Sequence, residues 1–143
     1  MRLSMARETF IDTSGFYALL IKRDETHEKA AQVLASAAKR RARFVTTDYV
    51  LDETVTLLCA RGQAHLVAPF IDSTLKSQAC IVEWMNPDRF AEAAKFLNKH
   101  LDQGYSFTDC VSFVTMKARG LRDALTKDEH FDKAGYVALL RNG

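Results

Sequence analysis

The sequence is poor in the residues that would build a disulfide framework, a zinc site or a membrane span. Only three of its 143 residues are cysteines, and no pair among Cys59, Cys80 and Cys110 has metal or redox spacing. The four histidines are scattered and include no HExxH pair, which argues against zinc. No run of about 18 apolar residues is present, and residues 1–7 lack the apolar centre of a signal peptide. We therefore expect reduced thiols, mostly core filler, in a cytoplasmic protein without a membrane partner.

Charge of one sign is also scarce. Twenty basic residues against 18 acidic ones give a net charge of +2, so any contact with nucleic acid must come from a local patch. The densest basic run, residues 39–43, follows a predicted helix, and we favour its interpretation as charge that complements the helix C-terminus over contact with phosphates. With 48% hydrophobic residues and no linker, residues 1–143 are expected to form one domain with a sizeable core.

Short β-prone runs alternate with helical stretches along the chain. The predicted strands are residues 9–11, 44–46, 80–84, 123–125 and 136–140. Between them lie helical stretches, of which the one at residues 63–77 contains Pro69 too deep for a first turn, so we expect a kink or a restart there. This alternation predicts an α/β fold with a mostly parallel sheet.

Four acidic residues stand where these elements change. Asp12 and Asp128 follow predicted strands, Asp109 lies in the first turn of a helix, and Glu53 lies one turn into another helix. Each has an ordinary interpretation taken alone, as a helix cap, a dipole-complementing acid, a turn residue or a solvated face. Because strand C-termini and helix N-termini share one edge of a parallel sheet, all four can meet in one cleft.

Such a cluster needs a cation, because carboxylates at close range raise one another's pKa. Mg²⁺ and Mn²⁺ both take oxygen ligands, and an all-acid site of this kind suits metal-assisted hydrolysis of phosphodiesters. Ser14 and Thr108 carry hydroxyls beside two of the acids, where they can orient a carboxylate or a water. Ser106 or Thr108 can also cap the helix that carries Asp109.

Four segments carry a resemblance to a known family. Residues 10–14 (FIDTS), 50–54 (VLDET), 106–113 (SFTDCVSF) and 125–131 (LTKDEHF) resemble the signature segments of the PIN domain, in that family's order and spacing. The resemblance runs from residue 9 to residue 140, and is strongest to bacterial PIN proteins related to the VapC toxins of toxin–antitoxin pairs. It implies a PIN-like three-layer αβα sandwich with a central, mostly parallel sheet of four to five strands.

The resemblance also implies a Mg²⁺-dependent ribonuclease. Asp12 and Asp109 would be direct metal ligands, and Asp128 would hold the metal directly or through water. Glu53 would orient or deprotonate the attacking water, with a ligand role as the alternative.

Supporting residues and partners follow from the same resemblance. The family's small hydroxyl residues fall on Ser14 and Thr108, and its threonine before the last acid falls on Thr126. The implied partners are an RNA substrate, a small antitoxin that blocks the groove and a second copy in a homodimer.

Two residues depart from the pattern. His130 could reach the cleft, but we favour a packed or capping histidine. Cys110 lies beside Asp109, and we favour core filler over a reactive thiol. The alternative functions are a catalytically weak PIN-like module that binds RNA or protein, and an acid-pocket phosphatase, for which Asp12 lacks a second aspartate two residues on.

Overall fold

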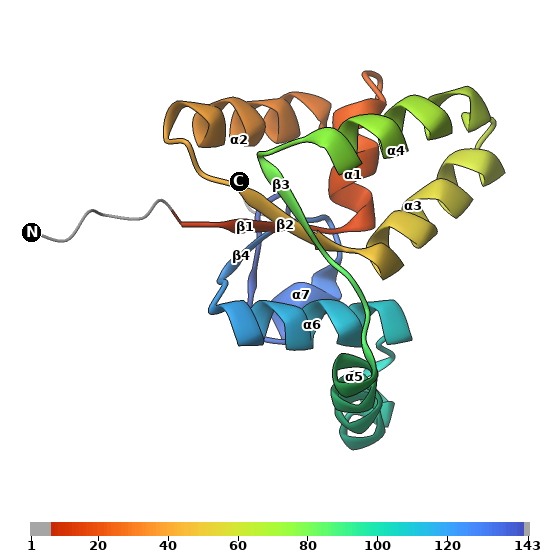
Figure 1. Ribbon diagram of the computed structural model, residues 1–143, viewed down its shortest axis with the longest axis vertical. Helices are drawn as coiled ribbons and strands as arrows, with labels where there is room; N and C mark the ends of the chain where they lie inside the picture. Colours follow the sequence, from red (N-terminus) through yellow and green to blue (C-terminus); the bar gives the residue numbers. More distant parts are fainter. Residues whose placement is uncertain (1–6, 142–143) are drawn as a thin grey trace, which may run out of the picture.

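The computed structural model describes residues 7–141, whose strands form one parallel sheet with helices on both faces (Figure 1). The strands are β1 (Thr9–Ile11), β2 (Phe44–Thr47), β3 (Cys80–Glu83), β4 (Asp123–Leu125) and β5 (Val137–Ala138). Their order in the sheet is β3-β2-β1-β4-β5, and every neighbouring pair is parallel. The predicted α/β fold and five-strand sheet are confirmed, but β5 is shorter than predicted. The chain turns there, with the Arg141 N–H donating to the Ala138 carbonyl.

Helices cover the sheet in two layers, as Figure 1 shows. On one face lie α1 (Thr13–Leu20), α2 (His27–Lys39), α3 (Asp48–Ala60) and α4 (Val67–Lys76). On the other lie α5 (Pro87–Lys99), α6 (Phe107–Arg119) and α7 (Glu129–Lys133). The predicted restart before Pro69 is confirmed, because a 3₁₀ turn at Ala64–Leu66 precedes α4 and leaves this proline in its first turn. No helix within residues 7–141 is long and apolar enough to cross a membrane.

The chain reverses direction across the sheet between β1 and β4. From β1 it proceeds outward to β2 and β3 over the layer of α1–α4, and then returns through α5 and α6 to β4 on the other side of β1. In open parallel sheets, ligands bind beyond the carboxyl ends of strands at such a switch point. Asp12 follows β1 and Asp128 lies three residues after β4, so the topology brings these two acids to that place.

The cysteines and the basic run lie outside the acid cluster. Cys110 is fully buried and burial raises the pKa of its thiol to about 11, which fits core filler, whereas Cys59 is exposed. The basic run at residues 39–43 ends α2 and leads into β2, at the sheet edge opposite Asp12. Within it Arg43 pairs with Glu8 at 3.0 Å.

Gly15 allows α1 to approach β4 more closely than any side chain would permit. A Cβ atom at this position would lie 2.1 Å from the Leu125 carbonyl oxygen, well inside van der Waals contact. The close approach places the start of α1, with Asp12 and Ser14, directly beside the end of β4. Position 15 therefore sets the spacing between the two strand ends at the switch point.

We expect Gly15→Ala to lower the free energy of unfolding by about 1–3 kcal/mol or more, as overpacking does, although alanine is the better helix former. The measurement is urea denaturation of both proteins. Gly120→Ala is the control, because Gly120 has a φ of 67° and open space around its Cβ position. An equal or smaller loss at Gly15 than at Gly120 would show that the close approach is unimportant.

Candidate active site

Asp12 lies between β1 and α1 with its carboxylate buried. Its backbone carbonyl accepts hydrogen bonds from the N–H groups of Gly15 and Phe16, but its side chain makes no capping bond. Instead, the Thr126 hydroxyl donates to Asp12 Oδ2 at 3.0 Å. The residue is only 4% exposed. Asp12 therefore occupies the predicted N-cap position of α1, but its side chain makes no capping bond and is held by Thr126 instead.

Thr126 connects three segments through one hydroxyl. Besides donating to Asp12, this oxygen accepts the Asp128 N–H at 3.0 Å and lies 3.1 Å from Ser14 Oγ. Ser14 Oγ accepts in turn from the Lys127 N–H at 2.8 Å. Because the single Thr126 proton goes to Asp12, the Ser14 proton is the one that joins the two hydroxyls. The predicted supporting residues Ser14 and Thr126 thus form one directed chain toward the Asp12 carboxylate.

Glu53 projects from α3 toward the start of α1. The Thr13 hydroxyl donates to Glu53 Oε1 at 2.6 Å. Because Thr13 directly follows Asp12 in the sequence, this bond holds the Glu53 carboxylate near Asp12. Its negative charge contributes to raising the pKa of Asp12, so the two side chains lie close enough to repel. Thr13 was not predicted to be important, although a hydroxyl directly after Asp12 is visible in the sequence.

Asp109 opens α6 through a capping box. The Ser106 hydroxyl accepts the Asp109 N–H at 2.9 Å, and Asp109 Oδ2 accepts the Ser106 N–H at 3.0 Å. Ser106 is therefore the cap, and not Thr108, whose carbonyl accepts from Ser112 Oγ at 3.0 Å. Asp109 is only 6% exposed, so its carboxylate is held between the helix start and the cleft.

His130 reaches the acids, contrary to our preferred interpretation. Its Nδ1 lies 3.0 Å from Asp109 Oδ2 and 3.4 Å from Asp128 Oδ1. Asp128 caps the short helix α7 by accepting the His130 N–H at 2.9 Å, which turns the imidazole back toward the cleft. The prediction of a packed histidine is correct only in that its ring meets Tyr105 edge-on at 5.4 Å. The spacing of two residues from Asp128 was the available signal.

The hydrogen-bond donors around the acid cluster do not fully offset the burial and mutual repulsion of its carboxylates. Burial is the main reason that the pKa of Asp12 is raised to about 7, and the charges of Asp109 and Glu53 contribute against the opposing hydrogen bonds from Thr13 and Thr126. Burial likewise raises the pKa of Asp109, with Asp128 adding to the effect, while the bonds from Ser106 and His130 lower it. The pKa shifts show that all four acids are coupled, directly or through a neighbour.

The donor set fits a divalent cation. Ligand atoms of Asp109, Asp128 and His130 all lie within 4.8 Å of one another. Asp12 lies outside that group but is buried beside it, with Asp109 among the charges that raise its pKa. Carboxylate oxygens are preferred by Mg²⁺ and Mn²⁺, and imidazole is compatible with Mn²⁺ and other transition metals. A cation at this place would relieve the repulsion that the raised pKa values report.

Comparisons with known proteins give the family and the fold to which this chain is similar. Residues 9–136 match the PIN domain family. The chain is 34% identical over 128 residues to the 23S rRNA-specific endonuclease VapC20 of Mycobacterium tuberculosis, in strains CDC 1551/Oshkosh and H37Rv, covering 90% of this chain and 95% of the relative. The crystal structure of Mycobacterium tuberculosis VapC20, a sarcin–ricin loop cleaving toxin, superposes with a TM-score of 0.81 at 32% identity. That match covers 90% of this chain and 96% of the solved one.

The raised pKa of Asp12 has a measurable effect on stability. Between the ordinary value of 3.8 and about 7, the folded protein holds a proton at Asp12 that the unfolded chain has lost. Wild-type stability in EDTA should therefore fall as pH rises through this window, by up to about 1.4 kcal/mol per pH unit from this group. Asp12→Asn has no titrating group at this position. The stability of the variant relative to the wild type should therefore increase from about pH 4 to about pH 7 and stay constant above that. Urea unfolding measures the difference.

The exposed Asp52→Asn is the matched control, and its difference from wild type should not follow this course. A gap between wild type and Asp12→Asn that stays constant across the pH range would contradict a buried Asp12 with a raised pKa.

Proposed function

The chain belongs to the PIN domain family, and we propose that it is a metal-dependent endoribonuclease of the VapC toxin type, built from one domain over residues 1–143. The observation that carries the proposal is the convergence of Asp12, Glu53, Asp109 and Asp128 from four separate segments at the switch point of a parallel sheet. Each is held there by a hydrogen bond from the fold, so the cluster persists although like charges repel.

Asp12, Asp109 and Asp128 are the proposed metal ligands, with Mg²⁺ as the cation and Mn²⁺ as the alternative. Bound there, the ion would lower the pKa of a water and stabilise charge on the phosphate oxygens. His130 is a further candidate ligand, because its Nδ1 already lies between Asp109 and Asp128. Both hydrogen bonds described for Asp109, from the Ser106 N–H and at His130 Nδ1, involve Oδ2, which leaves Oδ1 for the ion.

Glu53 is the proposed acceptor of the proton from the attacking water. Its Oε1 accepts a hydrogen bond from the Thr13 hydroxyl, which orients the carboxylate and leaves Oε2 for a second donor. A general base must lie within hydrogen-bond reach of the proton it removes, and a carboxylate fixed by a neighbouring hydroxyl meets that need without a rearrangement. Thr108 is the proposed residue that orients a water at the start of α6, where it lies half-buried.

RNA is the proposed substrate, since the VapC20 relatives are 23S rRNA-specific endonucleases and the solved one is a sarcin–ricin loop cleaving toxin. A ribosomal RNA hairpin is therefore the first probe to use. We further propose cytoplasmic location, where ribosomal RNA is found, a small antitoxin that blocks the acids, and a homodimer. These last two rest on family resemblance alone.

The proposal predicts cleavage of a sarcin–ricin loop RNA that requires Mg²⁺ or Mn²⁺ and stops in EDTA. Asp109→Asn should lower the rate by roughly 100-fold or more, because a lost ligand or base contributes at least this much. The asparagine oxygen can still accept the Ser106 N–H, so the start of α6 should survive. Gel analysis of cleavage products gives the rate, and circular dichroism checks the fold.

Asp52→Asn is the matched control for this experiment, because Asp52 neighbours Glu53 on α3 but is exposed. It should cut RNA as the wild type does. Cleavage that continues in EDTA, or an Asp109→Asn variant as active as Asp52→Asn, would remove the nuclease assignment.

The Thr126 hydroxyl gives a second prediction. Thr126→Val keeps the shape but removes the donor to Asp12 and the acceptor for the Asp128 N–H. Leaving these buried groups unpaired should cost about 1–3 kcal/mol in unfolding free energy, and activity should fall with the misplaced acids. Thr126→Ser retains the hydroxyl and should recover most of both. If valine and serine variants behave alike, the hydroxyl chain does not position the acids.

A further inference from the structure

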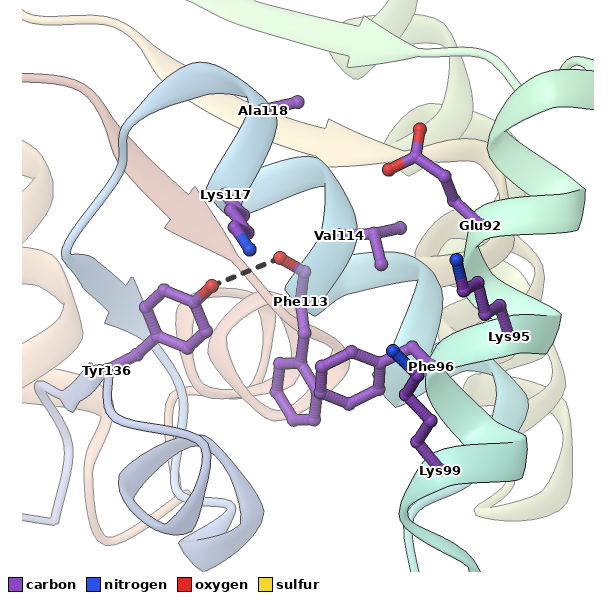
Figure 2. A pocket seen from close by; sticks show the side chains of 9 residues that line it. All are labelled: Glu92, Lys95, Phe96, Lys99, Phe113, Val114, Lys117, Ala118 and Tyr136. Carbon is purple, nitrogen blue, oxygen red and sulfur yellow. Dashed lines mark hydrogen bonds between the residues drawn. The ribbon is translucent and has the colours of Figure 1, made fainter.

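A second concave surface lies between α5, α6 and the turn before β5, and the acid cluster does not line it (Figure 2). Its volume is about 510 Å³, within the range of roughly 300–1,000 Å³ that is common for small-ligand pockets. The partly exposed rings of Phe96 and Tyr136 form its aromatic floor, and both pack on the ring of Phe113, which is only 1% exposed. The centroids of Phe96 and Phe113 are 5.8 Å apart, and the Tyr136 ring stacks 5.9 Å from that of Phe113. The Tyr136 hydroxyl donates to the Phe113 carbonyl at 3.1 Å, which fixes this ring at the edge of the cavity.

Three lysines surround this aromatic floor. Lys95 and Lys99 rise from α5, and Lys117 rises from the facing helix α6 (Figure 2). All three are exposed, and none takes part in an ion pair within residues 7–141. One acid, Glu92, lies among them, so three positive charges against one negative leave an excess of +2. A chain whose whole net charge is +2 therefore carries an equal excess at this one cavity.

Ring contacts in the core connect the cavity to the acid cluster. The buried Phe113 ring meets the Tyr105 ring edge-on at 5.0 Å. Tyr105 also meets the His130 ring, at 5.4 Å, and His130 Nδ1 lies 3.0 Å from Asp109. Asp109 and Lys117 both lie on α6, about 12 Å apart along its axis, so a substrate that extends past the acids along this helix would meet the lysines.

We propose that this cavity binds the single-stranded RNA segment adjoining the bond that is cut, with a base against the partly exposed rings of Phe96 and Tyr136 and phosphates at Lys95, Lys99 and Lys117. The inference rests on the proposed nuclease function, since it gives the same substrate a second contact. A cluster of carboxylates repels the RNA backbone, so a nuclease needs cations beside it to hold the strand. Base stacking on aromatic rings beside a basic groove is the usual way to hold a single strand without reading its sequence.

A protein occupant fits these observations less well. Lysine is depleted at protein–protein interfaces, where tyrosine, tryptophan, phenylalanine, methionine and arginine are enriched. A second copy or a peptide seated on the rings would bury three unpaired ammonium groups, and burying a charge without a partner is costly. Phosphates offer each lysine a partner of opposite charge.

The test compares RNA binding by wild type and by the triple variant Lys95→Gln/Lys99→Gln/Lys117→Gln. The probe is a fluorescein-labelled single-stranded RNA in EDTA, and anisotropy gives the affinity at several salt concentrations. Because the variant cannot neutralise three of the phosphates, affinity should fall by roughly tenfold or more, and the slope of log K against log salt should decrease by about 2. In Mg²⁺ the same variant should raise KM and leave kcat nearly unchanged.

The control variant Lys22→Gln/Lys39→Gln/Lys76→Gln makes the same change in net charge with lysines of other surfaces. It should lose little affinity. Equal losses in the two triple variants would mean that only total charge matters, and no loss in the first would mean that RNA lies elsewhere; either result overturns the proposal. If the first variant instead changes oligomeric state in size-exclusion chromatography and keeps its RNA affinity, the cavity is a contact between copies, and the proposal is wrong.

Ala118 provides a second test that leaves the packing of the fold intact, because it is an exposed helical residue at the cavity rim. Ala118→Glu should weaken RNA binding several-fold, Ala118→Lys should strengthen it, and Ala118→Gln should change it little. An order that does not follow the sign of the charge would contradict the inference. Because these affinities are measured without cleavage, a protein that binds RNA at the lysines but never cuts it would fail only the proposed function.

Discussion

Buried like charges that the fold forces together are the constraint on which this structure depends. Asp12 and Asp109 are almost completely withdrawn from water, and each is close enough to another acid for its pKa to rise. Such an arrangement is unfavourable by itself, because burial already disfavours the ionised form. The fold offsets part of this cost with hydrogen bonds to individual carboxylate oxygens. The Thr126 hydroxyl donates to Asp12, and the Ser106 N–H donates to Asp109. The resulting site is held in position but remains short of positive charge, which a divalent cation can provide.

The parallel sheet makes this arrangement possible. At a switch point the chain leaves neighbouring strands in opposite directions, so the side chains that follow β1 and β4 come together beyond the strand ends, between the two layers of helices. Gly15 then allows α1 to lie against the end of β4, so that the hydroxyls of Ser14 and Thr126 can form a hydrogen bond. The positions of the acids thus follow from the order of the strands, and their fine spacing follows from a missing side chain.

Much of this could be predicted from the sequence. Alternating strands and helices indicated the parallel α/β fold, and the four acids could be placed at one sheet edge because that edge follows from topology. Long-range pairings could not be predicted. Neither the Thr13 to Glu53 bond, which spans 40 residues, nor the His130 imidazole between two carboxylates has a local pattern. The aromatic cavity was missed for the same reason, because Phe96, Phe113 and Tyr136 come from three segments and each is an ordinary apolar residue where it stands.

Asp109 serves the helix and the cleft with one carboxylate, and this has a consequence for how the protein can diverge. The side chain that starts α6 by accepting the Ser106 N–H is the same one that faces His130. A descendant that abandoned chemistry would still need an acceptor at that position to keep its helix from fraying. Aspartate or asparagine would therefore persist there under selection for folding alone. Retention of the residue among distant descendants would be a poor guide to which of them are still enzymes, whereas Glu53, whose described bond is to Thr13 alone, would be free to drift.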